Sequence, residues 1–364
     1  MDLVAAAVAV VASAAVAVVA AAEAVAADAT KIIRLRASLE SRGLAFLGVV
    51  DLEVEKDFGR YQEWLASGFH ASLAYLEKNQ DIRKDASLVL PGAKRAVLFA
   101  LPYGQSDSWP MPENENPRAA LYSRFQDYHS LMRRLAEEAM AESNVTGRVC
   151  VDSVPLLERA LASKTGKGFI GKNTCFIQPE WGSFLLLGEI LTVEELPLVT
   201  EKAEENCGAC TLCQVECPTG ALNKDYTLDA GKCLSYWTIE QRGTIPYEYW
   251  PWLGKYWFGC DICQLVCPYN QSTKGLPESV PVRNYPALYE VATMDQKAYE
   301  LYFGGTPLTR AKRNGLRRNA LIAMCVTEDP LLSKALEASE GEGVIGETVV
   351  QISKFLSGQD EKVR

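Results

Sequence analysis

From residue 31 onward, apolar positions alternate between helical spacing and short continuous runs. Helical spacing is found at 31–42, 61–79 and 121–143, and apolar runs typical of buried strands are found at 44–50, 95–103, 147–151 and twice within 184–193. Gly43 follows the first helical stretch, in the position where a left-handed residue commonly ends a helix. Residues 110–117 are rich in Pro, Asn and Glu and predict a loop. This pattern predicts an α+β domain that ends near Pro197.

Residues 1–30 differ from the rest of the chain because Ala and Val fill nearly every position. The run from Leu3 to Ala22, broken only by Ser13, is long enough to span a bilayer or to serve as a signal. No Lys or Arg precedes Lys31, so the positively charged start of a signal peptide is missing. We therefore expect an extension unrelated to the fold, with an unusual anchor or a signal as alternatives.

The composition narrows the class of protein. A chain of 364 residues with 48% hydrophobic and 23% charged residues is typical of a folded protein with two or three domains. The net charge of −9 disfavours general nucleic-acid binding, because phosphate binding requires basic surface, although a local basic patch stays possible. Eight of the eleven cysteines fall between Cys207 and Cys267, which indicates a local function for them.

The cysteines follow the spacing of bacterial ferredoxins, in which one run supplies three thiolates to a [4Fe–4S] cube and a fourth to another cube. Two such runs each end in Cys-Pro, and Cys233 lies between them. The predicted ligands are Cys207, Cys210, Cys213 and Cys267 for one cube, and Cys217, Cys233, Cys260 and Cys263 for the other. A pair of four-cysteine zinc sites is the alternative. The remaining Cys150, Cys175 and Cys325 are expected to be small buried apolar residues.

Two cubes conduct electrons, so the reaction is expected in the first domain. Asp152 ends a predicted strand, and a helix with Glu158 and Arg159 follows. Carboxylates in this position often cap the next helix, and the residues alone leave that role open beside a catalytic one. The glycine-rich loop 164–173 carries three lysines but lacks the spacing of a phosphate-binding loop. His70 and His129 lie in ordinary helical contexts, outside any metal-binding motif.

Three strings, together with the double cysteine run, resemble the epoxyqueuosine reductase family. They are YQEWLASGFHASLAYL at 61–76, VDSVPLLERALASKTGKGFIGKNTC from Val151 and SYWTIEQRGTIP from Ser235. The resemblance extends from Lys31 to about Leu321. It implies an α+β, nitroreductase-like cobalamin-binding domain at 31–197 and a bacterial ferredoxin-like domain with two [4Fe–4S] clusters at 198–275. A C-terminal helical, HEAT-like region that binds tRNA would occupy 276–364, and residues 1–30 have no counterpart in the family.

The resemblance also implies the reaction, which is reduction of the epoxide of epoxyqueuosine in the tRNA anticodon loop, the last step of queuosine synthesis. Cobalamin without a protein axial ligand would be reduced to Co(I) by electrons from the clusters, which suits a chain with two ordinary histidines. Asp152 corresponds to the general acid, and burial against the corrin should raise its pKa. The implied cobalamin contacts are Tyr75, Arg124, Asp152, Lys172, Asn173, Ser235 and Asp261.

A basic segment supports a tRNA partner. Residues 306–326 contain five Lys or Arg and no acidic residue. Arg310, Arg313 and Arg317 have helical spacing and should share one face, and Arg242 is a further candidate for tRNA contact. A solvated helix face is the alternative. Thiolate clusters and a tRNA substrate predict a cytoplasmic protein, with no membrane contact, that acts as a monomer and receives electrons from a low-potential donor.

Two other functions fit part of the sequence. A reductive dehalogenase also pairs cobalamin with two [4Fe–4S] clusters, but such enzymes carry a twin-arginine signal, and residues 1–30 contain no Arg. A small organohalide would also not need the basic segment for its binding. An electron-transfer module that serves a partner enzyme is the second alternative, and a corrin absorption spectrum would distinguish it.

Overall fold

The structure of the chain is a computed structural model, and it describes residues 27–104, 118–124, 126–202, 205–271, 285–339, 341 and 343–358. Residues 27–41 form the first helix, so the fold begins before the expected start at Lys31. Residues 1–26 of the predicted extension and the predicted loop at 110–117 lie outside the described residues. Among the residues that are described, no helix has both the length and the apolar character needed to cross a membrane.

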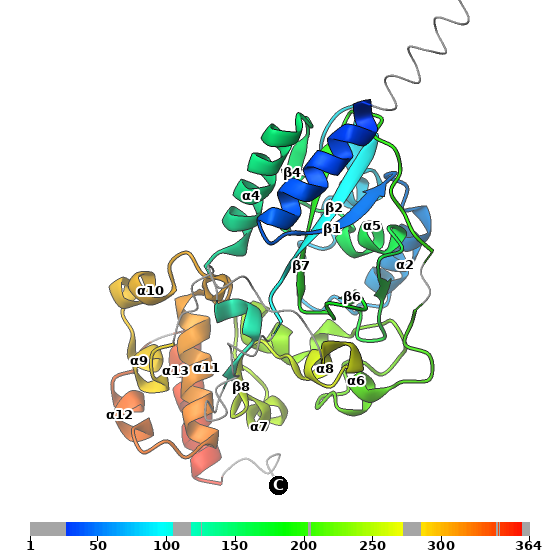
Figure 1. Cartoon of the computed structure of the whole chain (residues 1–364). Coiled ribbons are helices and arrows are strands. Elements are labelled where there is room, and N and C mark those ends of the chain that lie inside the picture. The colour runs from blue at the N-terminus through cyan, green and yellow to red at the C-terminus, as the bar shows by residue number, and fades with distance from the viewer. Residues whose placement is uncertain are drawn as a thin grey trace, which may run out of the picture.

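A four-stranded antiparallel sheet forms the centre of the first domain (Figure 1). Its strand order is β1-β2-β7-β4, with bounds Ala45–Val50, Arg95–Pro102, Leu185–Thr192 and Arg148–Cys150, respectively. The prediction of two strands within 184–193 is wrong, because β7 pairs with β2 without a break from Leu185 to Thr192. The strand β4 lies at an edge of the sheet, and the loop that follows it carries Asp152.

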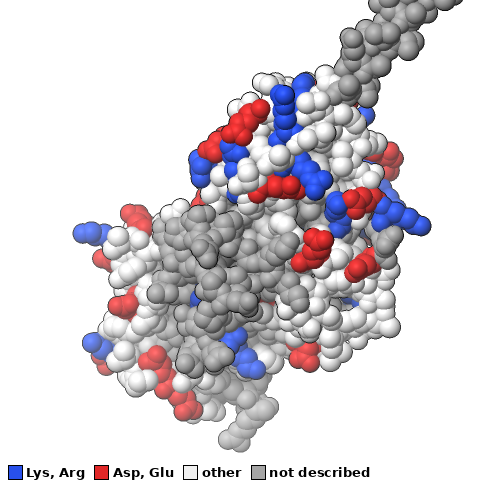
Figure 2. All heavy atoms as spheres, viewed as in Figure 1, with Lys and Arg blue, Asp and Glu red and all other residues white. Residues whose placement is uncertain are grey.

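Helices cover both faces of this sheet (Figure 1). The first helix and α4 (Tyr128–Ser143) pack on one face around Leu35 and Met132. On the opposite face, α5 (Glu158–Lys164) packs through Leu161. Burial from both sides explains why β2 and β7 consist almost entirely of apolar residues. Basic and acidic side chains are interleaved over the outer surface of the first helix and α4 (Figure 2).

Two predicted helices are shorter than expected. In place of 61–79, α2 spans Glu55–Ala66 and α3 spans Gln80–Lys84. The segment between them turns at Gly68 and Ala71, both of which have positive φ, so the helix cannot continue. In place of 121–143, a short 3-10 turn precedes α4, which begins after the N-cap Asp127.

Short elements connect the first domain to the cysteine-rich segment. The strand β3 (Arg118–Ala119) pairs in parallel with β8 (Tyr256–Phe258), and β5 (Phe169–Ile170) pairs with β6 (Phe176–Ile177). Each cysteine run contains one short helix, α6 (Leu212–Val215) and α8 (Ile262–Leu265), and the two helices contact each other. The parallel pair therefore joins residues that precede the Asp152 loop in the chain to residues beside the second cysteine run.

The C-terminal region is helical, as predicted. Its helices are α9 (Leu288–Thr293), α10 (Gln296–Phe303), α11 (Lys312–Val326), α12 (Leu332–Glu337) and α13 (Gly343–Leu356), and α7 (Trp250–Leu253) packs beside them. The helix α11 is central, with α7, α9, α12 and α13 around it. One hydrophobic core, which includes Trp250 and Leu321, joins these helices to the segment that follows the first cysteine run.

Candidate active site

Asp152 lies in a strained loop directly after the edge strand β4. Its φ is +50°, a left-handed conformation that is uncommon for residues other than glycine and that often marks functional positions. The side chain is 59% exposed. The Oδ2 atom accepts a hydrogen bond of 2.8 Å from the Tyr128 hydroxyl and lies 3.0 Å from His129 Nε2. The carboxylate is thus fixed by two side chains and still open to a substrate.

His129 links two carboxylates. Its Nδ1 lies 2.6 Å from Asp127 Oδ1, while its Nε2 faces Asp152, and the ring stacks on Tyr128 with 4.1 Å between centroids. The hydrogen bond with Asp152 raises the pKa of His129, and the Asp127 carboxylate adds to that effect. The arrangement is an Asp–His–Asp chain that ends at the solvent-exposed Asp152 carboxylate.

In the chain alone, the pKa of Asp152 is lowered, because His129 and then Tyr128 hydrogen bond to the charged carboxylate. The rise of this pKa expected from burial against the corrin stays a prediction. The helix-cap interpretation of Asp152 is wrong, since α5 begins after Leu157 with no side-chain cap. Sequence reasoning treated His129 as an ordinary helical residue. The sequence feature that could have identified His129 is its position two residues after Asp127, which is the N-cap of α4.

Two buried carboxyl groups lie beneath the Asp152 loop. The Glu189 side chain, on β7, is fully buried, and neither of its carboxyl oxygens has a hydrogen-bond partner among the described residues. Burial and the negative charge of Glu158 raise the pKa of Glu189 well above its usual value. Burial likewise raises the pKa of Glu158 to about 8, and its carboxyl accepts a hydrogen bond from the backbone of Asp152. Both groups therefore favour the protonated form, and neither was singled out from the sequence.

Tyr75 and Arg310 border Asp152 from other parts of the chain. The Arg310 guanidinium lies 5.1 Å from the centroid of the Tyr75 ring and forms a 2.7 Å ion pair with Glu240. Both Tyr75, which is 46% exposed, and Arg310 lie within electrostatic reach of Asp152. Arg310, predicted as a tRNA contact, is therefore placed beside a predicted cobalamin contact.

The prediction of one basic helix face is wrong. Arg310 lies in a separate 3-10 turn, and Lys312, with φ of +62°, interrupts the chain before the rest of α11. Arg313 and Arg317 do lie one turn apart on α11, but Arg317 is half-buried and its Nε donates a hydrogen bond to the Ala292 carbonyl. The neighbouring Arg318 is fully buried and donates hydrogen bonds to the backbone carbonyls of residues 237, 241 and 243.

The guanidinium group of Arg242, the other predicted tRNA contact, is directed toward the protein backbone. It donates hydrogen bonds to the carbonyl oxygens of Ile239, Arg310 and Ala311. In the chain, Arg242 comes shortly after a π-helix at Tyr236–Glu240, and π-helices are frequently found at functional sites. Its side chain thus holds the Arg310 turn beside Tyr75, in addition to any contact with a substrate.

The other predicted cobalamin contacts border the cysteines. The Lys172 N–H lies 3.4 Å from Cys207 Sγ, Asn173 Nδ2 donates to the Cys263 carbonyl, and Ser235 hydrogen bonds to the Cys233 thiol. Asp261 is buried and accepts a hydrogen bond from the Leu121 N–H, and burial raises its pKa to about 6. Arg124 is also buried, with its guanidinium 5.6 Å from the centroid of the Tyr285 ring. These residues connect the first domain to the two cysteine sets.

The thiols predicted as ligands of one cube lie near one another, and their assignment to two clusters stays a prediction. Electrostatic contact links Cys213 to Cys207, Cys210 and Cys267, and links Cys260 to Cys217 and Cys233, with Cys263 adjacent to that second group. All eleven cysteines are free of disulfide bonds. Cys150 and Cys325 are buried, as expected, whereas Cys175 is only partly buried and lies near Cys213, Cys263 and Cys267.

Two family models match these regions. Residues 206–270 match the family described as "4Fe-4S double cluster binding domain", and residues 83–153 match "Epoxyqueuosine reductase QueG, DUF1730". The epoxyqueuosine reductase of Pseudomonas aeruginosa is 35% identical over 314 residues, which cover 82% of this chain and 86% of that protein. The chain belongs to the epoxyqueuosine reductase family. The resemblance of the three sequence strings to this family is thereby confirmed.

Solved epoxyqueuosine reductases share the fold. The Streptococcus thermophilus enzyme is 25% identical, covers 91% of both chains and superposes with a TM-score of 0.77. An epoxyqueuosine reductase crystallised with an epoxyqueuosine-modified tRNA-Tyr stem loop is also 25% identical, with coverage of 87% and 88% and a TM-score of 0.73. The mixed helix and strand architecture is thus confirmed. The match at 206–270 supports iron–sulfur clusters over the zinc alternative.

Proposed function

We propose that this protein reduces epoxyqueuosine to queuosine in the anticodon loop of tRNA, with cobalamin as the reductant and two [4Fe–4S] clusters as its electron supply. One observation carries the proposal: this member of the family combines eight cysteines at cluster-ligand spacing with an exposed carboxylate that is hydrogen-bonded to histidine. The protein would act in the cytoplasm, where tRNA is found and thiols stay reduced.

The proposal includes a role for each part of the chain. The sheet and its flanking helices at 31–197 would form the nitroreductase-like cobalamin domain, and 198–275 the ferredoxin-like domain, which contains the matched segment 206–270. The helices from α9 to α13 would form the HEAT-like tRNA-binding region at 276–364. Packing of four neighbouring helices against α11 is consistent with that role.

The residues around Asp152 suit a corrin that has no axial ligand from the protein. Both ring nitrogens of His129 are engaged by carboxylates, and His70 Nε2 is paired with Glu77, 2.9 Å away. Cobalamin would supply a strongly reducing cobalt centre. Tyr75, with Asp152, would contact it from the first domain, and the other proposed contacts, which lie near the cysteines, are Arg124, Lys172, Asn173, Ser235 and Asp261.

Removal of the epoxide oxygen takes two electrons and two protons and releases water. Asp152 would donate the proton that the oxygen takes up as the first epoxide C–O bond breaks. The lowered pKa of Asp152 and the raised pKa of His129 place the proton on the imidazole before the reaction. Asp127 stabilises that imidazolium on its far side. His129 would first pass its proton to Asp152 Oδ2, and the carboxylic acid formed in this way would then donate that proton to the developing alkoxide. In this mechanism, His129 holds the proton before the reaction, and Asp152 transfers it to the substrate.

This role predicts a pH dependence. His129 carries its proton only below its raised pKa, so the wild-type single-turnover rate should fall as pH rises through that pKa, which lies above the ordinary histidine value. His129→Gln keeps a hydrogen-bond donor but cannot store a proton, and we expect it to slow the reaction about 10- to 100-fold near pH 7 and to remove that decline. His70→Gln, which changes the other histidine, is the matched control. Identical pH profiles for wild type and His129→Gln would contradict the role.

For the tRNA, we propose that Arg313 and Arg317 on α11, with Arg242 and Arg310, face the anticodon stem loop. The close approach of Arg313 and Arg317, whose charges interact, supports a local positive potential on α11. Arg242, Arg310 and Arg317 also make internal hydrogen bonds, so only their remaining N–H groups would contact the RNA.

The proposed function is tested by anaerobic reconstitution with iron, sulfide and cobalamin, followed by an assay on tRNA that carries epoxyqueuosine. We expect about eight irons and one corrin per chain, because eight thiolates can hold two cubes. Conversion to queuosine should require the corrin. A chain that binds about two zinc ions and no iron would contradict the cluster assignment, and a fully loaded chain that leaves epoxyqueuosine unchanged would contradict the reaction.

A further inference from the structure

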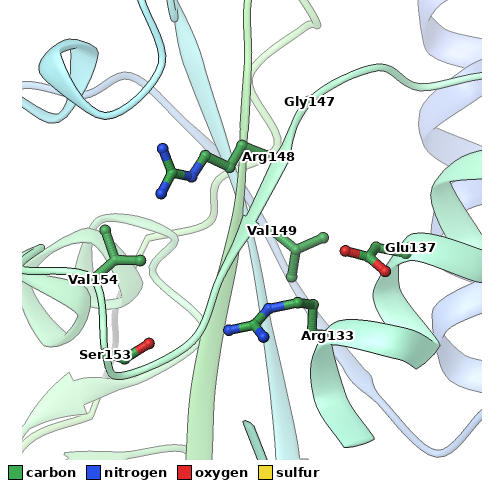
Figure 3. A pocket seen from close by; sticks show the side chains of 7 residues that line it. All are labelled: Arg133, Glu137, Gly147, Arg148, Val149, Ser153 and Val154. Carbon is green, nitrogen blue, oxygen red and sulfur yellow. The ribbon is translucent and has the colours of Figure 1, made fainter. Parts of the chain in front are cut away.

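An open cavity of about 510 Å³ lies on the far side of the Asp152 loop, between α4, the edge strand β4 and the residues that follow Asp152. It is lined by Arg133, Glu137, Gly147, Arg148, Val149, Ser153 and Val154. In Figure 3, the guanidinium groups of Arg133 and Arg148 both extend toward Ser153 and Val154, while the Glu137 side chain lies on the opposite side of β4. Two elements thus present positive charge to a turn that begins one residue after Asp152.

The cavity is lined by two arginines and one acidic residue, Glu137, so its basic residues are in excess. Nearby cations on the same surface have acidic partners: Arg134 pairs with Glu138, Arg42 with Glu138 and Glu142, and Lys31 with Glu194. Within the described parts of the chain, neither Arg133 nor Arg148 has an acidic group within ion-pair distance. Arg148 donates one hydrogen bond, from Nη1 to the Val89 carbonyl, which leaves its other N–H groups available.

We propose that this cavity binds a backbone phosphate of the tRNA substrate and thereby sets the position of the anticodon loop over Asp152. Guanidinium groups bind phosphate oxygens through paired N–H donors, which suits a site built from two arginines. In a chain with a net charge of −9, two unpaired arginines in one cavity indicate a specific anionic ligand rather than general surface charge. Phosphate contacts fix the register of a nucleic acid without reading its sequence.

The inference rests on the proposed function, because it takes tRNA as the source of the phosphate. It assigns a second binding surface, on the first domain, that is separate from the basic residues of α11. Ser153, which lines the cavity, directly follows Asp152, so a phosphate bound there would hold the RNA against the same loop that carries the proton donor. Loss of the contact should then impair turnover at subsaturating tRNA more than turnover at saturation.

The test measures binding of an epoxyqueuosine-modified tRNA stem loop across a range of salt concentrations, together with single-turnover rates, for the cobalamin-loaded protein. Arg133→Gln and Arg148→Gln should each weaken binding and reduce the slope of log K against log salt by about 0.7 to 0.9. Arg133→Lys keeps the charge and should retain most of the slope. Arg134→Gln is the matched control, because it removes the same charge from the adjacent position of α4 but from a residue paired with Glu138.

The outcomes separate this inference from the proposed function. If the wild type converts epoxyqueuosine, and Arg133→Gln binds tRNA with the same slope as Arg134→Gln, the phosphate site is refuted while the proposed function stands. If the wild type binds tRNA with a slope that depends on Arg133 and Arg148 but converts nothing, the site stands and the reaction is refuted. A wild type that neither binds nor converts the stem loop overturns both. Inorganic phosphate should compete with the tRNA for this cavity. If its addition weakens tRNA binding equally in wild type and Arg133→Gln, that result would also count against the cavity as the phosphate site.

Discussion

Asp152→Asn is expected to slow single-turnover reduction of epoxyqueuosine by about 10²- to 10⁴-fold, the usual contribution of a general acid. The amide keeps nearly the same shape and can still bond to Tyr128 and His129. It cannot take a proton from His129 and pass it to the epoxide oxygen. Asp152→Ala should be similarly slow, because the loss of proton transfer outweighs the loss of volume. The measurement is the single-turnover rate with corrin and iron content determined for each variant.

Binding measurements distinguish this role from a structural one. The tRNA stem loop and cobalamin should still bind to Asp152→Asn, and the clusters should still be reduced. Asp152 does not cap α5, so no loss of about 1 kcal/mol from a missing cap is expected. A fully loaded Asp152→Asn protein that turns over at a near-normal rate would remove Asp152 from the mechanism. The protonated Glu158 beneath the loop would then be the next candidate for the acid.

The core strands were predictable from the sequence, because strands buried on both faces form continuous apolar runs. Both β2 and β7 are of this kind, and only the division of β7 into two strands was wrong. Helix ends were less predictable. The helical spacing at 61–79 continues across Gly68, yet the backbone there adopts a left-handed turn that the periodicity of apolar positions cannot report.

The cysteine sets were predictable because the spacing of cluster ligands is local in the sequence. The surroundings of Asp152 were not, because its partners come from other elements. His129 contacts it from the first turn of α4, and Arg310 approaches it from the turn before α11. The lowered pKa of Asp152 in the chain alone could not be predicted for the same reason, since it comes from the hydrogen bond with His129, which outweighs the effect of burial. Such contacts depend on the tertiary structure alone.

Cys213→Ser and Cys263→Ser are each expected to damage one cluster and to abolish turnover. Cys213 lies with the thiols of the first set and Cys263 with those of the second, so each variant should lower the iron content from about eight to about four per chain. If the proposed function holds, electrons would reach the corrin one at a time through the clusters, so one damaged cluster should interrupt their transfer. Corrin binding should stay largely intact. Iron and corrin analysis after anaerobic reconstitution measures both effects.

Cys175→Ser provides a control within the same environment. The Cys175 thiol lies near Cys213, Cys263 and Cys267 but belongs to neither set of four, so its replacement should leave about eight irons and near-normal turnover. Loss of about four irons in Cys175→Ser, with full iron retained in Cys213→Ser or Cys263→Ser, would show that the ligand sets are assigned incorrectly. Full iron in all three variants would contradict thiolate ligation by these residues. Because serine is nearly isosteric with cysteine, loss of iron in only the two ligand variants must come from the missing thiolates rather than from a change in packing.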